Sequence, residues 1–220
     1  APYEKLLLMT VRVLVFSIWL ATTLAAAPKA KNVILFLGDA AGVPVINAAA
    51  AYKGSPQSLF IQKMPHVGLM DTSPASAWVS DSAAGMTAIV TGQKTENGVL
   101  SQSATAIRGK KDGETLKTIL EYAEQRGLST GVISTDRVTG ATPAACYAHS
   151  NSRSKAGEIF AQLLKPPYGD GVDVLIGGGK NVLTDAEKAA GTEVAAGLKN
   201  RGYAVLKTVD EFKSASGRAD

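Results

Sequence analysis

The chain has 220 residues, of which 45% are hydrophobic, and its formal net charge is +4. This composition supports a substantial hydrophobic core and excludes a wholly disordered chain. The basic residues are scattered and lack interleaved aromatic residues, so no nucleic-acid binding is predicted. The single cysteine, Cys146, excludes an internal disulfide, and two histidines, His66 and His149, are too few for a histidine-rich metal site.

Residues 1–30 have the pattern of a secretory signal peptide. Arg12 precedes an apolar run at residues 13–20, and small residues follow at 21–27. A basic start, a short apolar run and an Ala-x-Ala stop are typical of such peptides. We therefore predict cleavage near residues 25–30, no stable membrane span, and a periplasmic or secreted protein. A retained N-terminal anchor is the alternative.

The first predicted strand lies directly after this region. Residues 32–37 form a continuous apolar run, which predicts a strand buried on both faces, as in a parallel sheet. Asp39 follows at the carboxyl end of this strand, the edge at which open α/β sheets bind ligands. That position suits a metal-binding carboxylate. The alternative is an N-cap for the helix predicted over residues 44–51.

A short strand is predicted over residues 64–71, followed by a helix of small and apolar residues ending at Gly92. Asp81 and Ser82 open this helix. Both residue types are common caps, because their side-chain oxygens accept a free backbone N–H. A serine there also lies where unpaired N–H groups favour a phosphate. Alone, the pair is most often an ordinary cap, so a functional interpretation needs further residues.

The rest of the chain alternates between helical and strand patterns. The predicted elements are helices at 114–127, 154–164 and 186–201, and strands at 130–135, 172–176 and 203–206. Thr142-Pro143 begins a helical turn between two of them, and Arg153 offers a guanidinium that can bind two phosphate oxygens. Strand–helix–strand repeats predict a three-layer α/β/α fold with a mostly parallel central sheet.

Taken together, these groups resemble the alkaline phosphatase family, from about residue 31 to the end. The matching stretches are 32–39, 80–88 with 91–95, 141–144 with 147–149 and Arg153, and 174–179. The resemblance implies an incomplete alkaline-phosphatase-like fold. It also implies metal-dependent hydrolysis of phosphate monoesters through a phosphoserine intermediate.

The resemblance implies a role for each of five residues. Ser82 would be the nucleophile and a metal ligand, Arg153 would hold phosphate, and Asp81 would orient Arg153. Asp39 would bind a zinc and a nearby magnesium, and Thr142 would bind the magnesium. The expected cofactors are therefore zinc and magnesium, the expected substrates are phosphate monoesters, and a homodimer is one expected state of the full-length protein.

Two features depart from the family pattern. Ala40-Ala41 replace a Gly-Met pair, which trades backbone freedom for small side chains. Gly140 stands where the family commonly has an aspartate or a histidine beside the magnesium site. Glycine offers no side-chain ligand, so we assign Gly140 no metal role.

The family takes most of its zinc ligands from its C-terminal half, and no matching histidine cluster is present here. We therefore expect residues 31–220 to be the N-terminal part of a single catalytic domain, inactive without the C-terminal half. One alternative is another hydrolase of the alkaline phosphatase superfamily, such as a phosphodiesterase or a sulfatase. The other is a non-catalytic phosphate-binding module.

Overall fold

The computed structural model describes residues 30–191 and 193–215, and the chain divides into two compact units, residues 1–38 and 39–220. In the first unit, residues 30–38 contain no helix or strand, and the side chains of Val33 and Phe36 are exposed. The strand prediction for residues 32–37 is therefore wrong. A buried strand needs a hydrogen-bonded neighbour and cover on both faces, and the described part of the chain gives these residues neither. The signal-peptide prediction falls almost wholly on residues 1–29, outside the described part.

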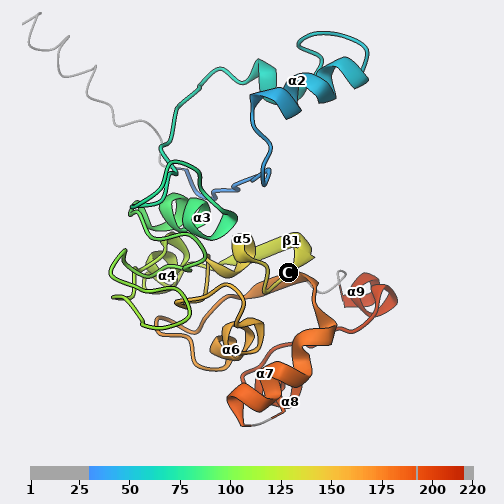
Figure 1. The fold of residues 1–220 in the computed structure, drawn as a ribbon. Coiled ribbons are helices and arrows are strands. Elements are labelled where there is room, and N and C mark those ends of the chain that lie inside the picture. Colours follow the sequence, from blue (N-terminus) through green and yellow to red (C-terminus); the bar gives the residue numbers. More distant parts are fainter. Residues whose placement is uncertain (1–29, 192, 216–220) are drawn as a thin grey trace, which may run out of the picture. The chain divides into compact units, whose positions relative to one another are not determined.

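The second unit combines a short sheet with a series of helices (Figure 1). Its α-helices are α2 (Val43–Tyr52), α3 (Ser82–Thr91), α4 (Ile119–Glu124), α5 (Ala141–Ala144), α6 (Ala156–Ala161), α7 (Leu183–Ala190), α8 (Val194–Asn200) and α9 (Val209–Ala215). The strands are β1 (Gly131–Arg137) and β2 (Val174–Gly178), and 3-10 turns form at η1 (Phe60–Lys63), η2 (Gln162–Leu164) and η3 (Lys180–Val182). None of the described helices is both long and apolar enough to cross a lipid bilayer.

The two strands form a parallel pair, with Gly131 opposite Val174 and Ile133 opposite Ile176. Parallel neighbours need a crossover connection, which α5, α6 and η2 supply here. The strands predicted near residues 130–135 and 172–176 are thus confirmed. Those predicted at 64–71 and 203–206 are wrong, because these apolar runs form no ladder with any described strand.

The core gathers buried side chains from α3, α5, α6 and β1 into one cluster. Helices α3 and α5 are in contact, and small residues such as Ala83 and Ala144 are fully buried between neighbouring segments. Small side chains let two backbones approach closely, so this region packs tightly. Among the described residues, the largest side chains that are completely inaccessible to solvent are those of Leu100 and Ile159.

Two predicted helices are shorter than the sequence pattern indicates. α4 begins only at Ile119, because Leu116 is still paired with Ser101 through its backbone N–H. The Thr118 side chain then caps the first turn and accepts from the N–H of Glu121. The helix predicted over 186–201 is divided into α7 and α8, since Gly191 takes a left-handed conformation (φ 66°) that ends α7.

Candidate active site

The site is built on the first turn of α3. Asp81 is the N-cap residue, and its carboxylate accepts the backbone N–H of Ala84 at 3.0 Å. Ser82 is therefore the first residue of the helix. The helix ends at Gly92 (φ 70°), so the predicted boundaries are confirmed at both ends.

Three oxygen-bearing side chains from distant parts of the chain meet here. The Ser82 hydroxyl donates to the two carboxylate oxygens of Asp39, with Oγ–Oδ distances of 2.9 and 3.1 Å. The Thr142 hydroxyl, on α5, donates to Asp39 Oδ2 at 2.9 Å. We call Asp39, Ser82 and Thr142 the oxygen trio. It forms because α3 and α5 pack together and both present a hydroxyl to the same carboxylate.

The backbone beside Asp39 is strained. Ala40 has a φ of 54°, in the left-handed region that favours glycine. A non-glycine residue there costs roughly 1–2 kcal/mol. The replacement of glycine by Ala40 is therefore not neutral, because the turn that presents the Asp39 carboxylate keeps the left-handed conformation with an alanine in it.

Asp81 and Arg153 form a partly exposed ion pair, in which Nη1 of Arg153 donates to Oδ2 of Asp81 at 3.1 Å. Burial acts to raise the pKa of Asp81. The backbone N–H groups of Ala84 and Gly98 and the Arg153 guanidinium outweigh that effect and hold the pKa below its ordinary value. Asp81 therefore both starts α3 and fixes one edge of the guanidinium.

The turn at Asn97-Gly98 braces this pair, a role that the sequence did not indicate. The side-chain oxygen of Asn97 accepts the backbone N–H of Asp81 at 2.8 Å. The carbonyl of Gly98 accepts the backbone N–H of Arg153 at 2.7 Å. Gly98 has a φ of 82°, and a Cβ there would lie 2.4 Å from the Arg108 side chain. Only glycine fits. The Asn-Gly dipeptide was a recognisable turn signal, but its distance along the chain from Arg153 hid its role.

The donor chemistry of the oxygen trio suits magnesium. A carboxylate and two hydroxyls are hard oxygen donors, and Mg²⁺ is commonly held by one or two carboxylates together with water. Zinc prefers nitrogen and sulfur donors alongside carboxylates. Among the described residues, no group of three or more His, Cys, Asp or Glu side chains could hold a metal ion. The residues present therefore fit a magnesium ligand set and do not make up a zinc site.

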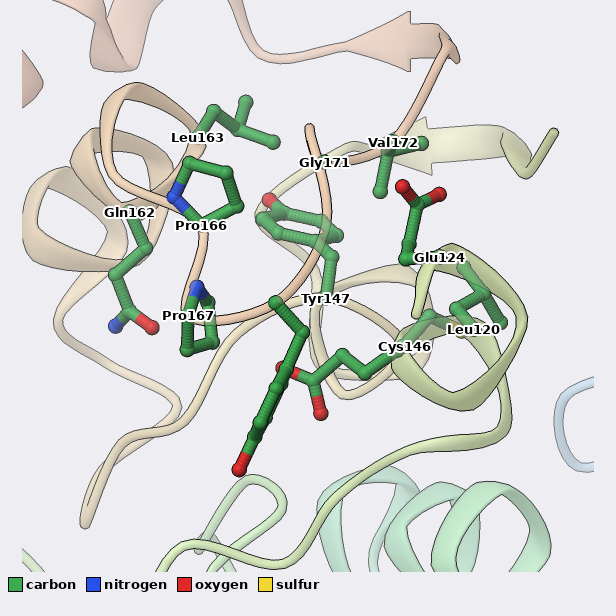
Figure 2. Close-up of a pocket in the computed structure, with 12 residues that line it drawn as sticks. Leu120, Glu124, Cys146, Tyr147, Gln162, Leu163, Pro166, Pro167, Gly171 and Val172 are labelled. Carbon is green, nitrogen blue, oxygen red and sulfur yellow. The ribbon is translucent and has the colours of Figure 1, made fainter. Parts of the chain in front are cut away.

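A separate small cavity lies beside α4, lined by residues that include Leu120, Cys146, Tyr147, Pro166 and Val172 (Figure 2). Its volume of about 20 Å³ is close to that of one water molecule. None of the five predicted site residues lines this cavity. Burial raises the pKa of the Cys146 thiol to about 12, so this thiol stays protonated at neutral pH.

A family sequence model described as alkaline phosphatase matches residues 30–218. The chain belongs to the alkaline phosphatase family. It is 35% identical to alkaline phosphatase 4 of Drosophila melanogaster over 178 residues, covering 70% of this chain and 30% of that relative. It is 34% identical to the human tissue-nonspecific alkaline phosphatase over 212 residues, covering 84% of this chain and 40% of the relative.

Solved structures show the same fold. The alkaline phosphatase of the Antarctic bacterium TAB5 superimposes with a TM-score of 0.66 and 29% identity, covering 77% of this chain and 45% of that chain. A mutant of the same enzyme, described with Mg bound in its M3 site, gives a TM-score of 0.63 at 29% identity over 74% and 43% of the two chains. The chain therefore has an α/β alkaline phosphatase fold, and it spans 30–40% of the length of the curated relatives named above.

A buried polar cluster centred on His149 was not indicated by any sequence motif. His149 Nε2 lies 2.7 Å from Glu121 Oε1, and its Nδ1 lies 2.7 Å from the Ser101 carbonyl oxygen. Both side chains are less than 10% exposed. The cluster joins α4, the segment after α5 and the loop at residue 101, so it holds together the elements that carry Thr142 and Arg153. A single histidine in the sequence carried no signal of that role.

Proposed function

We propose that the protein containing this chain hydrolyses phosphate monoesters through a phosphoserine formed on Ser82. The observation that carries the proposal is the convergence of the Ser82 and Thr142 hydroxyls on one carboxylate, directly beside the Asp81–Arg153 pair. A serine hydroxyl attacks phosphorus only when its alkoxide is stabilised. The hydrogen bond from Ser82 to Asp39 orients the hydroxyl, and the first turn of α3 holds its Cα in place.

Arg153 is the proposed phosphate-binding residue. Its Nη1 donates to Asp81, and within the described part of the chain the guanidinium forms no other hydrogen bond or ion pair. The remaining N–H donors are then available for two oxygens of an anion. Asp81 acts as a positioning residue, since it limits the rotation of the guanidinium that it binds.

Asp39 and Thr142, with Ser82, are the residues that would hold the metal. A bound divalent cation would stabilise a serine alkoxide and neutralise charge on the phosphoryl oxygens. The oxygen trio suits magnesium. For zinc, we propose that most ligands come from the part of the relatives' length that these 220 residues do not cover. These 220 residues would then be inactive on their own.

We also propose that the protein is periplasmic or secreted.

The direct test replaces the proposed nucleophile. Ser82→Ala in the intact protein, supplied with zinc and magnesium, should lower phosphomonoester turnover by at least about 10³-fold, because removing a nucleophile leaves only residual catalysis. Acid-quenched protein should also lose covalently bound phosphate. Ser80→Ala is the matched control, since among the described residues the Ser80 hydroxyl donates only to the carbonyl of Asp81. Normal turnover by Ser82→Ala would refute the proposal.

A substrate panel separates the neighbouring reaction classes. A phosphomonoesterase should turn over monoesters at least tenfold faster than diesters or sulfate esters. A preference for diesters or sulfates would replace the proposal with another reaction of the same superfamily. Phosphate binding without turnover, in protein saturated with both metals, would identify a non-catalytic module.

A further inference from the structure

The space beside Gly140 is filled by the carboxylate of Asp136. Gly140 is buried and precedes α5, two positions before Thr142. A Cβ built on Gly140 would lie 2.5 Å from Asp136 Oδ2 and 3.0 Å from the Arg137 carbonyl oxygen. Both distances are shorter than ordinary contacts, so a side chain at position 140 and the present place of the Asp136 carboxylate exclude each other. Glycine at 140 is what leaves room for Asp136.

Asp136 is also well placed to bind a ligand. It lies at the carboxyl end of β1, the edge at which α/β sheets bind their ligands. Its backbone N–H donates to Ser134 Oγ at 3.0 Å, whereas its carboxylate is exposed and accepts no hydrogen bond from the described residues. The carboxylate oxygens are therefore free to bind a cation or its water.

A second observation comes from the neighbouring residue. The Thr139 hydroxyl is buried, with the residue only 2% exposed, and has no hydrogen-bond partner among the described residues. A buried hydroxyl without a partner is destabilising, and in proteins a bound water or ion commonly supplies the missing partner. The turn between β1 and α5 thus holds, next to Gly140, a buried hydroxyl that can still bind a water or an ion.

The geometry points to Asp136 as a further ligand of the magnesium site that contains Asp39 and Thr142, acting directly or through a metal-bound water. This inference rests on the proposed function, because it assigns one more residue to the same cation site. Magnesium usually keeps several waters and is held by one or two carboxylates. The side-chain ligand that Gly140 lacks is supplied from four residues earlier. Asp136 touches no reacting atom, so it binds and positions the cation.

The test measures magnesium binding without substrate. Calorimetric titration of metal-free intact protein with Mg²⁺ should show about 10–100-fold weaker binding for Asp136→Ala, the loss typical when a supporting ligand is removed. The Mg²⁺-dependent rise in Tm should shrink in parallel. Asp136→Asn keeps the side-chain size and removes the charge, and it should also bind more weakly. Asp185→Asn, an exposed aspartate on α7, removes the same charge elsewhere and should bind Mg²⁺ as the parent protein does.

A relocation variant sharpens the result. Asp136→Ala combined with Gly140→Asp removes the contact with the Asp136 carboxylate, leaves the 3.0 Å approach to the Arg137 carbonyl oxygen, and supplies a carboxylate from position 140. Mg²⁺ affinity should therefore return at least in part toward the parent value. Thr142→Val distinguishes a failure of the Asp136 assignment from a failure of the proposed cation site. If Thr142→Val weakens Mg²⁺ binding and Asp136→Ala does not, the assignment of Asp136 is refuted and the cation site stands. If neither changes the affinity, the cation site of the proposed function fails as well.

Discussion

Two regions of the second unit are packed very differently, and residues 43–79, the region richer in apolar residues, are buried far less than residues 82–163. Between residues 43 and 79, only Ala50 and Pro74 are buried, and Tyr52, Leu69 and Trp78 are almost fully exposed. Between residues 82 and 163, α3, α5 and α6 form a continuous core that contains Leu100 and Ile159. The difference shows that hydrophobic composition alone does not produce packing. A run becomes core only where another element covers it.

The oxygen trio joins these two regions. Ser82 and Thr142 stand on helices of the packed region, whereas Asp39 comes just before the exposed one. Two of its members are therefore positioned by a core, and the third by a strained turn and its own hydrogen bonds. The stability and the geometry of the site should respond differently to changes in the two regions.

The largest expected effect tests the packing contrast directly. Ile159→Ala should lower the free energy of unfolding by about 2–5 kcal/mol, because it leaves a cavity among fully buried neighbours. The matched change in the other region, Leu69→Ala, should alter it by less than about 0.5 kcal/mol. Urea unfolding of the intact protein measures both. Equal losses would mean that residues 43–79 are packed in solution and would remove the contrast.

An intermediate loss in the free energy of unfolding is expected when the N-cap of α3 is removed. Asp81→Ala should cost about 1 kcal/mol, the usual value of an N-cap. The pKa of Asp81 is lower in the folded state than in the unfolded state, so its ionised form stabilises the fold. That stability is present above the unfolded pKa of about 3.9 and is lost as the pH falls through the lower folded value.

Unfolding measured between pH 7 and pH 2 should therefore show a smaller loss of stability in acid for Asp81→Asn than for the parent protein. Asp185→Asn, which is not an N-cap, should follow the parent curve. Parallel curves for the parent and for Asp81→Asn would show that Asp81 does not carry this dependence.

The smallest expected effect is an increase, rather than a decrease, in the free energy of unfolding. Ala40→Gly should stabilise the protein by up to about 1 kcal/mol, since glycine adopts a φ of 54° without strain and loses part of that gain to its greater chain entropy. Ala41→Gly is the control. Ala41 has no positive φ, so glycine there brings only the entropic loss. Equal destabilisation by both variants would show that the turn before α2 is not strained.

The sequence predicted what depends on neighbouring residues. The cap at Asp81, the end of α3 at Gly92 and the two paired strands follow from local preferences, and the structure has them all. The strand at residues 32–37 was wrong, because apolarity indicates that a segment can be buried but not whether a partner covers it. Asp39 was singled out by its position after that predicted strand, and resemblance to a family then gave a metal-binding role to both Asp39 and Thr142, whose contact spans 103 positions.

Other features depend on side-chain directions that no local pattern encodes. Gly140 had no predicted role, yet the carboxylate of Asp136 lies where its Cβ would be. Asn97 had no predicted function, yet its side chain accepts the backbone N–H of Asp81. Both contacts depend on how a turn folds back on the residues near it, which only coordinates show.

The His149–Glu121 contact has a consequence for charge. Nδ1 faces a carbonyl oxygen, which only accepts, so this nitrogen must carry a hydrogen. Nε2 faces a carboxylate oxygen at 2.7 Å, which requires one proton between them. Whichever atom holds that proton, imidazole and carboxyl together sum to zero. These two side chains thus join the elements around Thr142 and Arg153 without adding net charge to that part of the protein.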